Sequence, residues 1–250
     1  MSNLSLASSN HIFKHLNLNL LIHFEFLNNI ILIFLLLSWL FTFTFGGFIP
    51  AGDANLEWSF LLIHPLLYSI LVPAVGMRLW SDEKRTGTIE LLGTFPLPPW
   101  AAIIGKFLAA STVWFIALLL TFPLVITVNY LGSPDNGRIL SGYIGSFLTC
   151  NVFLAITVLV SACTRDQVVC LIVSVMLCVL TLVCGHEDII REIAKFTPSY
   201  LVEGMISLGV WDHFRSLTRG LFRYQDMVWF TSVILTCLIG TSAILSAKRA

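Results

Sequence analysis

The chain has 250 residues, of which 57% are apolar and only 11% are charged. A soluble domain carries roughly 25% charged residues, so a soluble fold with so few charges would expose a largely apolar surface. Basic and acidic residues number 14 each, which leaves no basic excess to attract polyphosphate. The composition therefore excludes an ordinary soluble protein, a disordered chain and a nucleic-acid-binding protein, and it indicates a polytopic membrane protein.

Six apolar runs follow one another along the chain, and a helix of about 20 apolar residues crosses a bilayer. The runs cover residues 30–48, 60–77, 100–130, 139–162, 168–185 and 227–246. They leave no room for a large soluble domain, so we expect one all-α membrane domain over residues 1–250. The third run is longer than one span requires, and we expect Pro123 to bend it.

The segment before the first run mixes Leu and Phe with Asn, His and Glu between residues 16 and 28. This mixture is typical of a helix that lies at the membrane interface. Residues 1–29 lack the basic, apolar and small-residue layout of a cleaved signal peptide. We therefore expect the first span to serve as an uncleaved insertion signal.

The distribution of Lys and Arg in short loops predicts the orientation, because such residues collect on the cytoplasmic side. The loop after the first run has none, whereas three later segments carry Arg78, Lys84, Arg85, Arg165, Lys248 and Arg249. This alternation places both termini in the cytosol of a multi-pass protein, which we expect in the inner (cytoplasmic) membrane of a bacterium. Residues 186–226 then lie outside, although they contain five basic residues.

The spans contain almost no ionisable groups. Asp, Glu, Lys and Arg are absent from the middle of all six, whereas ion-coupled carriers place such residues at bilayer depth. His64, near the start of the second run, is the one ionisable candidate, and a polar residue at the interface is favoured over a proton relay. This pattern argues against secondary transport.

No catalytic motif, metal site or cofactor site is recognisable in the chain. Gly105-Lys106 is followed by Phe107, and no Gly lies five residues before Gly105, so this is not a phosphate-binding loop. The six cysteines form no Cys-x-x-Cys pair, and we expect them to be buried structural residues. We therefore expect a chain that is not an enzyme and that receives energy from a cytosolic partner.

The polar stretch between the second and third runs, about residues 78–99, predicts a short cytosolic amphipathic helix. Ser81 is the candidate N-cap, and Leu79, Glu83 and Glu90 would share one face with the backbone at Gly87. A glycine costs about 1 kcal/mol in a helix interior, so Gly87 indicates either a close approach or a break. From the pattern alone, this segment is either a docking site or a solvated connector.

The same stretch resembles the signature of ABC-2-type permeases. The family pattern is Glu-x-x-x-Gly-Thr-x-Glu-x-Leu, then prolines, then Gly-Lys at the start of the third span, and it is matched by Glu83, Gly87, Thr88, Glu90, Leu92, Pro96, Gly105 and Lys106. The chain is most similar to the gliding-motility-type branch, which carries a His-Phe…Arg-Gly patch before the last span. That patch is matched by His213, Phe214, Arg219, Gly220 and Asp226.

The resemblance implies the permease subunit of an ABC transporter, an exporter that works with a separate ATPase. The segment before the first span would be an elbow helix, and residues 82–94 a coupling helix whose ATPase contacts are Glu83, Lys84, Arg85, Gly87, Thr88, Glu90, Leu91 and Leu92. Two permease subunits, identical or different, would pair in the bilayer with two ATPases. Residues 186–226 would form extracellular re-entrant helices, and an auxiliary membrane protein with an exported domain is a further expected partner.

Two questions stay open at this stage. His213, Phe214, Arg219 and Gly220 form either an extracellular gate or partner contact, or a turn that stabilises the fold. The alternative to the transporter is a non-transporting membrane anchor or scaffold that recruits an ATPase for mechanical or regulatory work.

Overall fold

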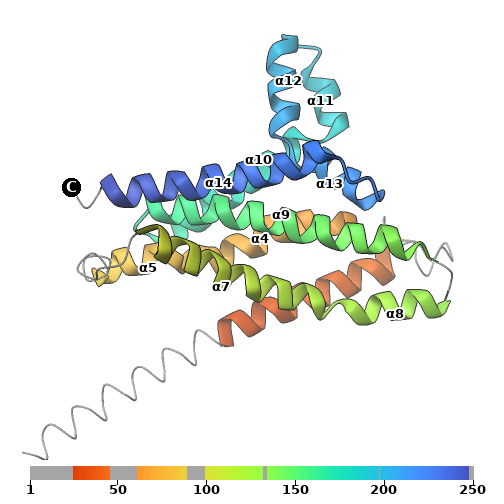
Figure 1. The fold of residues 1–250 in the computed structure, drawn as a ribbon, viewed down its shortest axis with the longest axis horizontal. Coiled ribbons are helices and arrows are strands. Elements are labelled where there is room, and N and C mark those ends of the chain that lie inside the picture. Colours follow the sequence, from red (N-terminus) through yellow and green to blue (C-terminus); the bar gives the residue numbers. More distant parts are fainter. Residues whose placement is uncertain (1–24, 46–60, 89–98, 132–133, 197, 248–250) are drawn as a thin grey trace, which may run out of the picture.

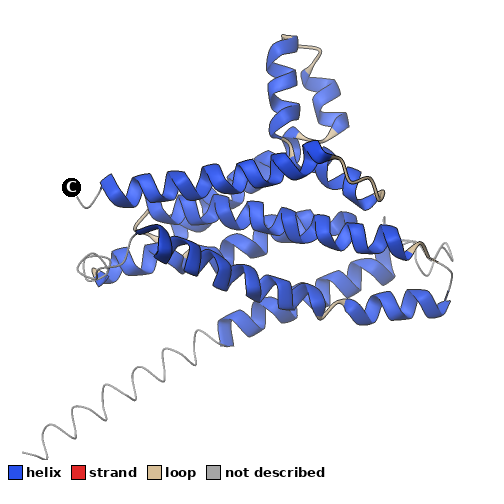
Figure 2. Cartoon of the chain, viewed as in Figure 1, coloured by secondary structure: helices blue, strands red, loops and turns tan. Residues whose placement is uncertain are grey.

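The computed structural model describes residues 25–45, 61–88, 99–131, 134–196 and 198–247. Every regular element in these residues is helical (Figure 2). Six helices are long and apolar enough to cross a membrane, namely Glu25–Thr44, Leu61–Thr86, Trp100–Tyr130, Asn136–Cys163, Gln167–Cys184 and Tyr224–Ala247. The six predicted spans are therefore confirmed, with shifted boundaries.

The first two spans are less regular than their apolar runs suggest. The first is helical from residue 25 and ends in the π-helical turn η1 (Phe41–Phe45), while the predicted elbow region before residue 25 lies outside the described residues. The second comprises the short 3-10 helix η2 (Leu61–Ile63), α4 (His64–Gly76) and α5 (Arg78–Thr86), separated from α4 by Met77 alone. The apolar span thus runs almost directly into the polar segment.

The third span is bent, as the sequence predicts. It consists of α7 (Pro99–Leu119) and α8 (Phe122–Leu131), with a break at Leu120 and Thr121. Pro123 lies in the first turn of α8, where its missing N–H costs no helical hydrogen bond. Figure 1 shows α8 diverging from the bundle at this break.

The fourth span, α9 (Asn136–Cys163), is the centre of the molecule, and α4, α7, α13 and α14 pack around it (Figure 1). Small residues bring the neighbours close, since a Cβ at Gly142 would lie 2.2 Å from Leu61 Cδ1 and one at Gly145 would lie 2.9 Å from Leu217 Cβ. Close approach through small residues is how helices associate where lipid is as apolar as the side chains.

The fifth and sixth spans are α10 (Gln167–Cys184) and α14 (Tyr224–Ala247). Asp135 caps α9 by accepting from the N–H groups of Gly137 and Arg138, and Asp166 caps α10 by accepting from Val168 N–H at 2.8 Å. Four of the six cysteines are buried as expected, whereas Cys163, at the end of α9, is exposed and Cys237 is partly buried.

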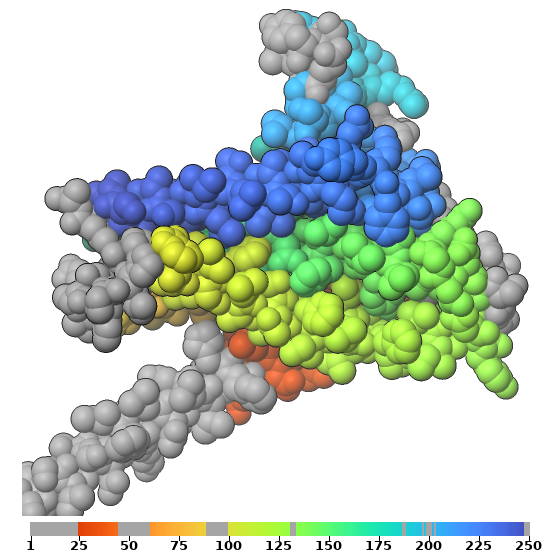
Figure 3. Space-filling view, viewed as in Figure 1, coloured from red at the N-terminus to blue at the C-terminus, as the bar shows by residue number. Residues whose placement is uncertain are grey.

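Between α10 and α14 lie three short helices, α11 (Glu187–Ile193), α12 (Ser199–Leu208) and α13 (Val210–Thr218). The α11–α12 pair runs across the bundle axis and projects sideways from it (Figures 1 and 3). In contrast, α13 packs on α9 and α10, and Val210, Phe214 and Leu217 are completely buried.

The helices alternate in direction, and the two ends of the bundle hold different elements (Figure 1). We call the "α5 end" the one that holds α5, the turn between α9 and α10, and the last turn of α14. We call the "α13 end" the opposite one, which holds α13, the tip of α8 and the start of α9.

Candidate functional site

The family-like segment is built on α5, which is a continuation of the second span and not an independent helix. Ser81 was predicted to cap a new helix, and this is wrong, because Ser81 is buried inside α5 and its hydroxyl donates to Met77 O. The helix stops at Gly87, whose φ of 74° lies in the left-handed region that only glycine adopts without strain. One continuous helix over 82–94 is therefore also wrong, and residues 89–94 lie outside the described residues.

Ser161, near the end of α9, fastens the junction between α4 and α5. Its hydroxyl accepts from the N–H groups of Trp80 at 3.0 Å and Ser81 at 3.1 Å, and it donates to Met77 O at 3.1 Å. A serine hydroxyl has one donor and two acceptor sites, so Ser161 uses all of them on this junction. The contact fixes the start of α5 to the central helix.

Lys106 of α7 holds the other side of α5. Its ammonium group lies 2.5 Å from Glu83 Oε1 and 2.5 Å from Leu79 O, and it stands 3.9 Å from the centre of the Trp80 ring. About a quarter of each charged side chain is exposed, 23% for Lys106 and 29% for Glu83. An ion pair so shielded, with a cation–π contact beside it, links the third span to α5 more firmly than a surface pair would.

Two further polar contacts connect α5 to the turn between α9 and α10. Lys84 donates to the carbonyl of Ala162, and Gln167 donates to the carboxylate of Asp82. Asp82 is also 3.7 Å from the guanidinium of Arg85, one turn along the helix. The polar face of α5 is thus joined to α7, α9 and α10 at the same time.

The predicted ATPase contacts fall into three groups. Glu83 and Lys84 face the protein's own spans and are only partly exposed, whereas Arg85, Gly87 and Thr88 are exposed. Glu90, Leu91 and Leu92 lie outside the described residues. The inward contacts were not predicted, although Lys106, a lone lysine in an apolar run, was a signal for a buried partner.

Residues 32–187, more than half of the chain, match the model of the ABC-2 family transporter proteins. The chain belongs to this family. It is the permease of an ABC transporter and an integral multi-pass membrane protein, and its family implies an ABC ATPase and a lipid bilayer as partners. No curated protein is similar enough to the chain to give a match.

The second predicted site lies at the α13 end of the permease. His213 Nδ1 is 2.7 Å from the carboxylate of Asp226, and its ring stacks on Trp229 with centroids 4.5 Å apart. The Asp226 carboxylate, 3% exposed, also lies 3.7 Å from Arg223. The structure therefore brings His213 together with Asp226, and the pair joins α13 to the first turn of α14.

The other three residues of that site are spread around the same turn. Phe214 is completely buried, and Gly220, with a φ of 79°, allows Leu221 N–H to reach Ser216 O at 3.0 Å. The side chain of Arg219 points to the surface and is exposed. Of the two readings, this geometry favours a turn that stabilises the fold.

The permease also has a polar cluster that the sequence did not reveal. His64 was expected at the membrane interface, but it is completely buried between helices, with Nδ1 2.8 Å from Ser146 Oγ. The Tyr68 hydroxyl lies 2.9 Å from the same oxygen, and the ring of Phe34 stacks on Tyr68. The cluster joins the first, second and fourth spans. Its polar groups are stable in the interior because they are hydrogen-bonded.

Proposed function

We propose that α5 and the segment after it couple this permease to its ATPase. The observation that supports the proposal is the set of contacts that α5 makes with the spans. It continues α4 directly, and Lys106, Ser161 and Gln167 join it to α7, α9 and α10. A displacement of α5 would therefore move four spans together, as switching between two access states requires.

In this proposal the outward residues touch the ATPase and the inward residues transmit its movement. Arg85 and Thr88 present polar groups at the α5 end, and Glu90, Leu91 and Leu92 continue the docking segment. Glu83 and Lys84 are positioning residues, because their charged groups already pair with Lys106 and the Ala162 carbonyl.

The remaining assignments rest on the distribution of Lys and Arg and on the resemblance to ABC-2-type permeases. We infer that the α5 end and both termini face the cytosol, that residues before 25 form the elbow helix, and that the protein is an exporter of the gliding-motility-type branch in a bacterial inner membrane. Two permease subunits would form the transport path, with an exported-domain membrane protein as an auxiliary partner. The chain itself would perform no catalysis, and ATP would be hydrolysed in the ATPase.

The α11–α12 pair fits the proposed re-entrant helices. It runs across the bundle axis, as Figure 1 shows, and the two helices with their connection carry exposed apolar side chains such as Phe196 and Leu208 beside the charged pair Lys195 and Glu192. A helix pair of this composition, lying along the membrane plane, suits the outer interface.

Two exposed arginines at opposite ends of the bundle test the coupling proposal. Arg85→Glu should weaken retention of the ATPase on the purified permease by roughly tenfold or more, because it reverses charge on the docking surface. Arg219→Glu makes the same change at the α13 end and should leave retention unchanged. Glu90→Lys should act as Arg85→Glu does.

The proposal is wrong if Arg85→Glu and Glu90→Lys both retain and stimulate the ATPase like the wild type. The wild-type complex in vesicles tests the scaffold role. ATP turnover without movement of any lipid, glycan, drug or peptide would favour that role over transport.

A further inference from the structure

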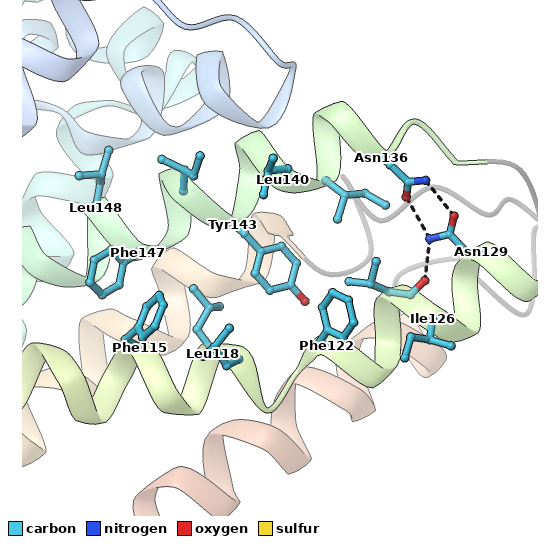
Figure 4. Close-up of a pocket in the computed structure, with 14 residues that line it drawn as sticks. Phe115, Leu118, Phe122, Ile126, Asn129, Asn136, Leu140, Tyr143, Phe147 and Leu148 are labelled. Carbon is cyan, nitrogen blue, oxygen red and sulfur yellow. Dashed lines mark hydrogen bonds between the residues drawn. The ribbon is translucent and has the colours of Figure 1, made fainter.

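A groove of about 790 Å³ lies between the first half of α9 and the end of α7 with α8 (Figure 4). It exists because the chain breaks at Thr121 and α8 diverges from the central helix. Both walls belong to candidate membrane spans, so the groove opens toward hydrocarbon. Its volume lies in the range of ligand pockets, about 300–1,000 Å³.

The walls of the groove are almost entirely apolar. Phe115 and Phe147 pack edge to face at its inner end with ring centroids 5.3 Å apart, and Leu118, Phe122 and Ile144 continue the lining. The Tyr143 hydroxyl is 2.9 Å from Thr121 Oγ1, so this polar group already has a partner. The body of the groove therefore suits a hydrocarbon chain.

A pair of amides closes the other end of the groove. Asn129 Nδ2 donates to Asn136 Oδ1 at 3.0 Å, and Asn136 Nδ2 donates to Asn129 Oδ1 at 3.1 Å (Figure 4). Asn129 also donates to Val125 O at 2.9 Å, which uses both of its N–H groups. Among the described hydrogen bonds, the second N–H of Asn136 has no acceptor, and it can donate to an oxygen of a ligand.

The length of the groove matches one leaflet. It follows α9 from Asn136 to Leu148, about 18 Å at a rise of about 1.5 Å per residue. The hydrocarbon core is about 30 Å thick, so one leaflet is roughly 15 Å deep. The groove thus runs along the membrane normal, with its polar end where a lipid carries its ester and head group.

The mouth of the groove indicates how the polar end of an occupant would be recognised. Charge at the mouth is balanced, because Arg138 lies 3.3 Å from Asp135 and both side chains are exposed. The lining and the amide pair thus suit an apolar chain whose polar end is recognised by hydrogen bonds and not by charge.

We propose that this groove binds one acyl chain of a phospholipid, with Asn136 donating to an ester or head-group oxygen. Lipid hydrocarbon is as apolar as the groove, so retention depends on packing against the aromatic rings and on the amide pair. The site itself does not depend on the coupling proposal. In the proposed orientation the groove lies in the outer leaflet, and only this assignment rests on the proposed function.

Native mass spectrometry of the permease alone, purified from vesicles of equimolar phosphatidylcholine and phosphatidylglycerol, tests the site. We expect one retained phospholipid per chain, with similar occupancy for the two lipids. Ile144→Trp fills the groove and should lower occupancy by roughly tenfold, and Asn136→Leu by roughly three- to tenfold. Ile172→Trp, on the exposed face of α10, is the matched control and should retain the lipid.

Several outcomes would overturn the proposal. The proposal is wrong if the lipid adduct persists in Ile144→Trp, or if Ile172→Trp loses it to the same extent. It is also wrong if phosphatidylglycerol alone forms the adduct. If Ile144→Trp instead dissociated an oligomer and left the lipid bound, the groove would be a protein interface. Leu140→Trp, at a 65% exposed wall position, repeats the test where Ile144→Trp unfolds. The lipid assay contains no ATPase, so an empty groove can be told apart from a failure of the coupling proposal.

Discussion

The two ends of the permease use their charged residues differently. At the α5 end, the polar contacts join residues far apart in sequence, with Glu83 reaching Lys106 on α7 and Lys84 reaching Ala162 on α9. At the α13 end, the contacts of the buried Asp226 carboxylate are local, with His213 and Arg223 within 13 residues, and a neutral hydrogen bond from Ser141 Oγ to Leu217 O joins α13 to α9. The contacts of Glu83 and Lys84 thus connect separate spans, whereas those of Asp226 hold the turn between α13 and α14. The comparison suggests that a change at the α5 end alters communication between helices, whereas a change at the α13 end alters stability.

The largest effect is expected for Asp226→Asn. The substitution keeps the size of a nearly buried side chain but removes the charge that His213 and Arg223 share, so the free energy of unfolding should fall by about 2 kcal/mol. Thermal unfolding in detergent measures it, and Asp212→Asn, an exposed position on α13, is the control. A variant of normal stability that no longer stimulates the ATPase would break the comparison between the two ends.

A smaller loss of stability is expected for Lys106→Met, about 1–2 kcal/mol, because Glu83 loses a partly shielded partner. Glu83→Lys should cost a similar amount and also lower ATP-driven transport. The double swap of Glu83→Lys with Lys106→Glu should recover part of the loss that each of these two single reversals causes, as a double-mutant cycle over the three variants would show. The exposed ion pair Lys195–Glu192 provides the control, since Lys195→Ala should change neither stability nor transport. Additive effects in the swap would mean that this pair does not link α5 to α7.

The smallest effect is expected for Gly87→Ala. Apart from its chain neighbours, none of the described residues has an atom within 4 Å of the added Cβ, so the expected cost is backbone strain, about 1 kcal/mol in the left-handed region. Gly87→Asn should cost less, because asparagine tolerates that conformation better. Gly105→Ala, which also meets open space but at an ordinary helical backbone, is the control in the same thermal unfolding assay. Equal stabilities for Gly87→Ala and Gly105→Ala would show that the turn after α5 is not fixed.

The sequence predicted the spans well but the partners of single residues poorly. The bend at Pro123 was predictable because a proline acts on its own helix, whatever surrounds it. The surroundings of His64 were not, because its burial depends on Ser146, which lies 82 residues away, and on the rotation of two helices. The start of α5 was missed for a similar reason, since Ser161 accepts from the N–H groups at the position where Ser81 was expected to cap a new helix.

By itself, the sequence determined that the chain spans a membrane six times as an all-helical protein and that it resembles ABC-2 permeases. Apolar run length and local motifs carry that information, because bilayer thickness and helix geometry are the same for every protein. Only the tertiary structure decided which charges of the family segment face the spans and which stay exposed. It also placed the amide pair of Asn129 and Asn136 at the mouth of a groove. These features arise from contacts between helices, whose rotation and spacing are set by the packing of all the spans together.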